Sequence, residues 1–281
     1  MKLNSIVLAV TILLILPGIS LQAQTNTSTS TNTERPRTPS DVSPADLAAI
    51  QSHLTKEEFA EFQSWVAIGP GGLPHTLEGY RSLQGLNKKL RNPLDISQLT
   101  PKMGKTGDIV ALPGLPKRSG ERALIAPFAI PHRQLNQHNN DSIREKQKAM
   151  FKEVVGHNKT LVHFQKSYFE KHNDAVFLND SAKGNQTVVS TTHGEVGHMH
   201  PSDGSMHFSL SPSDTKEVLE KGWGELHGLA GQVYKGNDAL PPTYMMVYAP
   251  RTEQELAVVK QILQAAIRYS SLNTSLPADS K

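Results

Sequence analysis

The residues best suited to chemistry in this chain are histidines, and they are concentrated in one stretch. Of the twelve histidines in 281 residues, five lie between residues 193 and 231: His193, His198, His200, His207 and His227. Imidazole is the side chain that exchanges a proton near neutral pH, and it is also the commonest ligand of transition metals. This stretch is therefore the first place to look for a functional site.

The spacing of these histidines predicts a β-hairpin. Residues 201–204 (PSDG) are turn formers, and Asp and Gly tolerate the backbone angles of a short hairpin loop. With that loop, His200 lies opposite Ser205 and His198 opposite His207. Because side chains alternate across a strand, His198, His200 and His207 share one face. The other face carries Met199, Met206, Phe208 and Leu210, which suits a core.

A face with three histidines supports two chemistries. The first is metal ligation, completed by the carboxylate of Asp203 or Glu195; in this register Glu195 falls on the opposite face and is the weaker candidate. The second needs no metal: one histidine is a general base and the others donate to a developing oxyanion. A third interpretation is that the imidazoles only hydrogen-bond to their neighbours.

Three further positions are candidates near ligands. His227 lies in the glycine-rich GWGELHGLAG segment, which we expect to be a loop, with Trp223 as a flat apolar wall. The alternative role of His227 is contact with the C-terminal end of the preceding helix. Arg251 follows a predicted strand, where a guanidinium can reach a carboxylate or enolate oxygen; alternatively it pairs with Glu253 or Glu255.

Composition excludes several classes of function. The formal charge of +3 comes with no basic run, and aromatic residues make up only 6%, so a nucleic-acid surface is not expected. The chain has no cysteine, which excludes cysteine nucleophiles and disulfides. It also lacks a P-loop, a dinucleotide-binding glycine fingerprint, a G-x-S-x-G elbow and an H-E-x-x-H motif.

The N-terminus resembles a secretory signal. Residues 1–23 have a positive start, an apolar run and a small residue at the end, so we expect a cleaved signal peptide and a secreted or periplasmic protein without a stable membrane span. An N-terminal membrane anchor is the alternative. The Thr/Ser/Asn-rich residues 24–42 are expected to form a disordered linker, and residues 273–281 a tail.

The remaining chain, residues 43–272, predicts one α+β domain. Residues 43–140 form a helical and irregular arm, with helices near residues 44–53, 56–66 and 79–90. Residues 141–272 form the core: an antiparallel sheet that contains the histidine hairpin, packed by helices. Its expected helices begin at residues 142, 212 and 253, and its expected strands cover residues 161–169, 174–179, 187–192 and 243–248. Hairpins followed by helices, without strand–helix alternation, favour this class.

Several motifs resemble the luciferase-domain family, which includes the light-emitting luciferases of luminous fungi. They are GHMH with SMHFSL, KEVLEKGWGELHGLAG and PPTYMMVYAPRTEQE, with fainter similarity across residues 60–270. The resemblance implies oxidation of a hydroxylated styryl-pyrone (3-hydroxyhispidin) by O2, with ring opening and loss of CO2. The turn after the His-x-His pair is one residue shorter than in the fungal enzymes, and the cleavable signal replaces their membrane anchor.

The resemblance also implies a set of site residues and partners. The expected catalytic residues are His198, His200, His207, Asp203 and His227, and the expected substrate contacts are Trp223, Arg251 and Tyr248. O2 is the expected co-substrate, and a pyrone or aromatic small molecule is the expected binding partner. A divalent metal is expected, if present, at His198, His200 and His207. The rival functions are a metal-dependent enzyme such as a hydrolase, and a non-catalytic module that binds a small molecule.

Overall fold

The computed structural model describes residues 42–272 except 106, 183 and 236–237. The predicted signal peptide, nearly all of the predicted linker and the predicted tail lie outside these residues. All described residues fall in one compact unit. Among the helices of this described part, none has the length and apolar character required to span a bilayer.

A six-stranded antiparallel sheet is the centre of the fold, in the order β1-β2-β3-β4-β8-β5. The strands are β1 (Val162–Lys166), β2 (Asp174–Leu178), β3 (Glu195–Met199), β4 (Met206–Ser209), β5 (Gly224–Leu226) and β8 (Tyr244–Val247). A separate ribbon pairs β6 (Val233–Lys235) with β7 (Asp238–Ala239). The predicted α+β class is confirmed, and the histidine hairpin β3–β4 lies in the middle of the large sheet.

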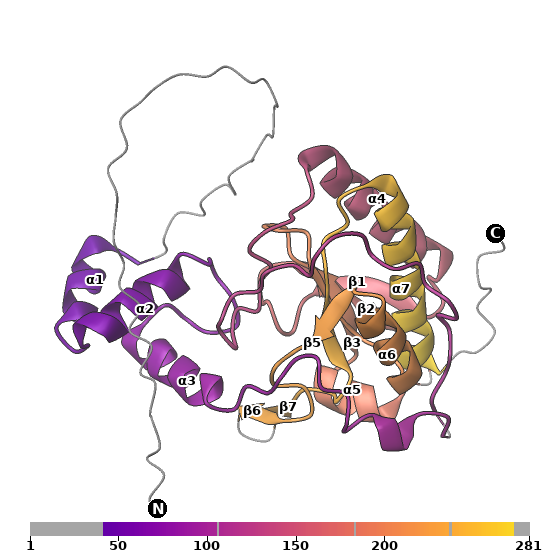
Figure 1. Ribbon diagram of the computed structural model, residues 1–281, viewed down its shortest axis with the longest axis horizontal. Helices are drawn as coiled ribbons and strands as arrows, with labels where there is room; N and C mark the ends of the chain where they lie inside the picture. Colours follow the sequence, from indigo (N-terminus) through magenta and orange to yellow (C-terminus); the bar gives the residue numbers. More distant parts are fainter. Residues whose placement is uncertain (1–41, 106, 183, 236–237, 273–281) are drawn as a thin grey trace, which may run out of the picture. The chain divides into compact units, whose positions relative to one another are not determined.

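Two long helices cover one face of this sheet. The helices α4 (Asp141–His157) and α7 (Glu253–Ser271) run side by side against it (Figure 1). Phe151 of α4 stacks on Phe208 of β4, with ring centroids 6.2 Å apart. Met206 and Phe208 are fully buried, as expected for the apolar face of the hairpin. The histidine face therefore points away from α4 and α7.

The N-terminal arm contributes three helices, α1 (Pro44–Gln51), α2 (Lys56–Val66) and α3 (Leu77–Asn87), and the 3-10 helix η1 (Thr100–Lys102). Ser43 caps α1, and Thr55 with Glu58 forms a capping box at the start of α2. Trp65 and Tyr80 are fully buried, which anchors α2 to α3. Residues 88–140 are largely irregular and wrap the sheet through scattered backbone hydrogen bonds.

Four local predictions were wrong. Residues 187–192 are helical: α5 (Gln186–Thr192) is capped by Asn185, so this cap and the tertiary packing outweigh the β-branched composition. The expected loop GWGELHGLAG contains strand β5, because its backbone pairs with β8. Helix α3 begins earlier than predicted, capped by Thr76. Helix α4 begins at Asp141, one residue before the predicted start, because Asn140 caps it.

The short helix α6 (Pro212–Glu220) completes the core. The helix begins at residue 212 as predicted, and the side chain of Ser211 caps it, with proline in the first helical position. The helix packs beside β5, and Asp214 in its first turn accepts backbone N–H groups from Ala111 and Leu112 of the arm. One buried carboxylate thus joins the arm to the core.

Candidate functional site

The hairpin has the register that the sequence predicts. His198 pairs with His207, and the backbone N–H of His200 donates to the carbonyl of Ser205 at 2.8 Å. Gly204 closes the turn with a φ of +80°, a conformation that L side chains rarely adopt. Gly197 allows the strands to approach closely, since a Cβ there would lie 2.3 Å from the carbonyl oxygen of His207.

Three imidazoles converge on the buried face of the hairpin. Nε2 of His198 lies 3.2 Å from Nε2 of His200 and 3.2 Å from Nδ1 of His207. These side chains are at most 3% exposed. The structure therefore brings the three predicted histidines together, with little access for bulk water.

Glu195 also reaches this cluster, and the expectation that it lies on the opposite face was wrong. Phe177 of β2 pairs with Glu195 while Val176 pairs with Gly197, so Val196 is the extra residue of a bulge. A bulge reverses the alternation of side chains beyond it. Oε1 of Glu195 consequently lies 2.5 Å from Nδ1 of His198.

Asp203 acts on the cluster through a serine. Oγ of Ser205 lies 2.8 Å from Nδ1 of His200 and 2.5 Å from Oδ1 of Asp203. The backbone N–H of Ser205 donates to the same carboxylate at 2.8 Å. The turn that fixes the hairpin register therefore also fixes the ring orientation of His200.

Three more side chains join from segments that the sequence does not single out as the site. His132, in the irregular arm, places Nδ1 3.1 Å from Nε2 of His207. Glu170, in the β1–β2 loop, places Oε1 3.9 Å from Nε2 of both His198 and His200. Arg133 pairs with Glu170 and lies 3.9 Å from Asp203.

A cavity of about 620 Å³ opens in front of the cluster. Its polar floor consists of His132, His198, His207, His227 and Glu170. Its apolar walls include Ile130, Phe169, Leu229, Leu240 and Tyr244. One side is formed by α3, with Glu78, Ser82, Gly85 and Leu86, and by Lys89 just beyond the helix. The ring of Tyr244 stacks on His207, with centroids 5.1 Å apart and planes at 12°. The arm and the core together therefore enclose a space of the size that binds small molecules.

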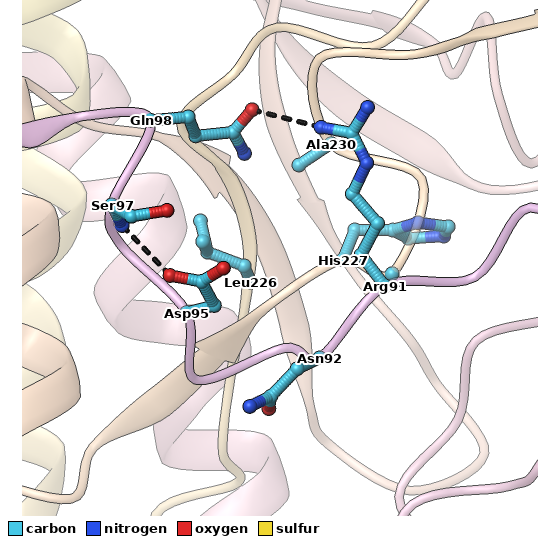
Figure 2. Close-up of a pocket in the computed structure, with 9 residues that line it drawn as sticks. Arg91, Asn92, Asp95, Ser97, Gln98, Leu226, His227 and Ala230 are labelled. Carbon is cyan, nitrogen blue, oxygen red and sulfur yellow. Dashed lines mark hydrogen bonds between the residues drawn. The ribbon is translucent and has the colours of Figure 1, made fainter.

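His227 borders this cavity on one side and a smaller pocket on the other. Figure 2 shows the smaller pocket, of about 60 Å³, where residues 91–98 of the arm pass over Leu226, His227 and Ala230. The backbone N–H of Arg91 donates to the carbonyl of Gly228 at 3.0 Å. Nδ1 of His227 accepts the backbone N–H of Leu229 at 3.0 Å. His227 is thus held firmly by backbone at the wall of the cavity.

The three expected substrate contacts lie elsewhere, and none of them lines the cavity. Trp223 is buried and donates from Nε1 to the carbonyl of Pro116 at 2.6 Å. The hydroxyl of Tyr248 donates to Glu225 at 2.7 Å. Arg251 pairs with Glu255 and donates to the carbonyl of Ser119 at 2.8 Å. Their side chains join the arm, the sheet and α7.

The electrostatics of the site keep four imidazoles neutral, those of His132, His200, His207 and His227. Burial, which disfavours imidazolium, lowers the pKa of His200 and of His227 to about 4. Burial and neighbouring histidines lower the pKa values of His132 and His207 well below the usual range. Burial opposes ionisation of Glu170, but the Arg133 guanidinium beside it lowers its pKa to about 2.

This arrangement offers neutral nitrogens beside ionised carboxylates. Such nitrogens can accept a proton from a substrate or bind a metal ion. Two overlapping triads place one nitrogen from each residue within 4.8 Å of the others: His132, His207 and His227, and His198, His200 and His207.

Comparison with known proteins places the chain in a family. The model of the luciferase domain matches residues 193–266, which cover the hairpin, β5, β8 and most of α7. The luciferase of Armillaria ostoyae is 33% identical over 222 residues, which are 74% of this chain and 80% of the relative. The luciferase of Neonothopanus nambi is 31% identical over 221 residues, covering 74% and 79%. No solved structure matches. The chain therefore belongs to the luciferase-domain family.

Proposed function

We propose that this protein is an O2-dependent enzyme that oxidises a small hydroxylated pyrone or aromatic compound in the histidine-floored cavity. The observation that carries the proposal is the cavity of about 620 Å³ whose floor is built from buried histidines and Glu170, in a chain similar to proteins named luciferases. Small-molecule sites typically occupy roughly 300–1,000 Å³. The cavity is of the size that a substrate with one or two rings requires.

The walls of the cavity suit a planar substrate. Phe169 and Tyr244 lie with their ring centroids 5.3 Å apart, and Leu229 and Leu240 add apolar surface. Stacked rings gain energy from aromatic partners beyond the burial of their area. The hydroxyl groups of such a substrate then face the polar floor, where the imidazoles are.

The neutral imidazoles supply the base that this oxidation needs. O2 adds to an electron-rich ring carbon when the neighbouring hydroxyl has lost its proton. His207 lines the cavity, and burial and neighbouring histidines, which lower its pKa, keep the ring in the neutral form that can accept this proton. Nδ1 of His132 lies 3.1 Å from Nε2 of His207 and orients the ring through this contact. The substrate provides the electrons, both oxygen atoms of O2 bond to it, and loss of CO2 leaves a product with one carbon less and the same number of oxygens.

Oxygen consumption tests this proposal. The full-length chain is supplied with hydroxy-pyrones and catechols, and O2 uptake and light emission are recorded together. His207→Gln removes the cavity base and is expected to lower uptake roughly 10²–10⁴-fold. His157→Gln is the matched control, because that side chain is 75% exposed on α4. If no compound causes uptake by the folded protein, or if His207→Gln retains full uptake, the proposal is wrong.

A further inference from the structure

Two imidazoles of the hairpin are fixed in the same tautomer by the partners behind them. Nδ1 of His198 lies 2.5 Å from Oε1 of Glu195, and in this hydrogen bond the ring N–H donates and the carboxylate oxygen accepts. The hydroxyl of Ser205 donates to Asp203 at 2.5 Å, so its oxygen accepts from Nδ1 of His200 at 2.8 Å. A ring with its one proton on Nδ1 has a bare lone pair on Nε2, and both rings turn this nitrogen toward the other.

These two lone pairs face each other. The two Nε2 atoms are 3.2 Å apart, and neither carries a proton to place between them. Two acceptors at this separation repel each other unless a cation lies between them. Nδ1 of His207 lies 3.2 Å from the first of these atoms, and Oε1 of Glu170 lies 3.9 Å from both. The arrangement thus directs nitrogen lone pairs and a negative charge at one point.

We propose that Nε2 of His198, Nε2 of His200 and Nδ1 of His207 bind a divalent transition-metal ion, with Glu170 as the carboxylate ligand. Metal–nitrogen bonds of about 2.0–2.1 Å in a tetrahedral arrangement separate the nitrogens by about 3.4 Å, close to the 3.2 Å observed. Imidazole nitrogens with one carboxylate are the donors of zinc, iron, copper and nickel sites. Carboxylates behind the ligating rings, such as Glu195, are the usual outer shell of such sites.

His132 selects the required tautomer of His207. When Nε2–H of His207 donates to Nδ1 of His132, 3.1 Å away, Nδ1 of His207 is left as a lone pair that points to the other two. The hairpin set then has three donor nitrogens. The second triad, of His132, His207 and His227, is less suitable, because Nδ1 of His227 accepts from Leu229 and the other ring nitrogen donates to the carbonyl of Ala129.

The ion would lie at the floor of the substrate cavity, since His198, His207 and Glu170 line it. A histidine and carboxylate set with open positions is also found in iron oxygenases. With the ion bound, Nδ1 of His207 is a ligand, so the role of His207 as base applies to the protein without the ion. Binding of the ion rests only on the geometry of these side chains. The metal site and the proposed oxidation can therefore be refuted separately.

Metal binding by the full-length chain tests the assignment. The protein is freed of metal with a chelator and titrated with Co2+, Zn2+ and, without oxygen, Fe2+; bound metal is measured by elemental analysis and Co2+ geometry by visible absorption. One ion per chain is expected. His200→Gln should abolish stoichiometric binding, and Glu195→Gln, which keeps all ligands, should weaken affinity roughly 10–100-fold.

His227→Gln is the matched control, because it removes a buried histidine of the same cavity that belongs only to the second triad. It should bind the ion as tightly as the unchanged protein. Circular dichroism checks the fold of each variant, and Glu170→Gln gives a second test of a ligand if His200→Gln does not fold. Absence of a stoichiometric ion, or equal binding by His200→Gln, would overturn the assignment. Oxygen uptake is not part of this readout.

Discussion

Replacement of Arg133 by Met is expected to destabilise the protein severely. The side chain is 4% exposed and pairs with Glu170, which is 7% exposed. NH1 donates to Oε1 of Glu170 at 3.2 Å, NH2 bonds to the other oxygen, and Nε lies 3.9 Å from Asp203. Met has a similar length but no charge, so the substitution leaves two buried carboxylates without their cation.

The expected decrease in the free energy of unfolding follows from the burial and the charge of these groups. A charge pair about 4 Å apart in an effective dielectric of about 20 contributes about 4 kcal/mol, and Arg133 faces two carboxylates. Breaking a buried pair by removing one partner typically costs about 3–5 kcal/mol. Since small domains are stable by roughly 5–15 kcal/mol, the variant should retain only part of its stability. The double variant Arg133→Met/Glu170→Gln removes the orphaned charge and should recover more than half of the loss.

Urea unfolding followed by the fluorescence of the two tryptophans measures this free energy. A chelator is present, so that no bound ion replaces the guanidinium. Arg81→Met is the control, because Arg81 pairs with Glu58 at the surface with its side chain 46% exposed, and exposed pairs contribute about 0–1 kcal/mol. Two results would refute this prediction. Arg133→Met could lower the free energy of unfolding no more than Arg81→Met does, or the losses of Arg133→Met and Glu170→Gln could simply add in the double variant.

Three further predictions concern other parts of the fold. Burial raises the pKa of Asp214 from 3.8 to about 6, so the folded state holds this proton more tightly than the unfolded state. The contribution of Asp214 protonation to the free energy of unfolding is complete below pH 3.8 and is lost as the pH rises through 6. With about 1.4 kcal/mol per pKa unit, Asp214→Asn should remove about 3 kcal/mol of pH dependence, measured by unfolding between pH 4 and pH 8; an unchanged pH profile would contradict this. Gly204→Ala should cost at least about 1–2 kcal/mol because of the positive φ, and should also lower oxygen uptake because the turn orients His200; unfolding and activity assays check both, and an unperturbed melting temperature would refute it. Arg251→Ala should lower stability by about 1–2 kcal/mol through lost hydrogen bonds while leaving KM unchanged, and a raised KM would restore this residue to the substrate site.

The sequence by itself determined the parts of this protein that depend on local interactions. The register of the hairpin follows from the turn residues 201–204 and from the alternation of histidines with Met206 and Phe208, since a slip by one residue would expose the apolar face. The caps at Ser43 and Ser211 likewise involve only residues that are near in sequence. The luciferase-domain motifs lie in the same local segments, so the family was also readable from the residues.

Only the tertiary structure decided which side chains complete the site. His132 and Glu170 come from an irregular arm and a strand-connecting loop, and no periodicity marks where such segments touch a sheet. The bulge at Val196 turned Glu195 toward His198, because one extra residue reverses the alternation on which the sequence prediction relied. Trp223, Tyr248 and Arg251 have suitable chemistry but point to other partners. Residue type and spacing identify what a side chain can do, whereas the packing of distant segments determines what it faces.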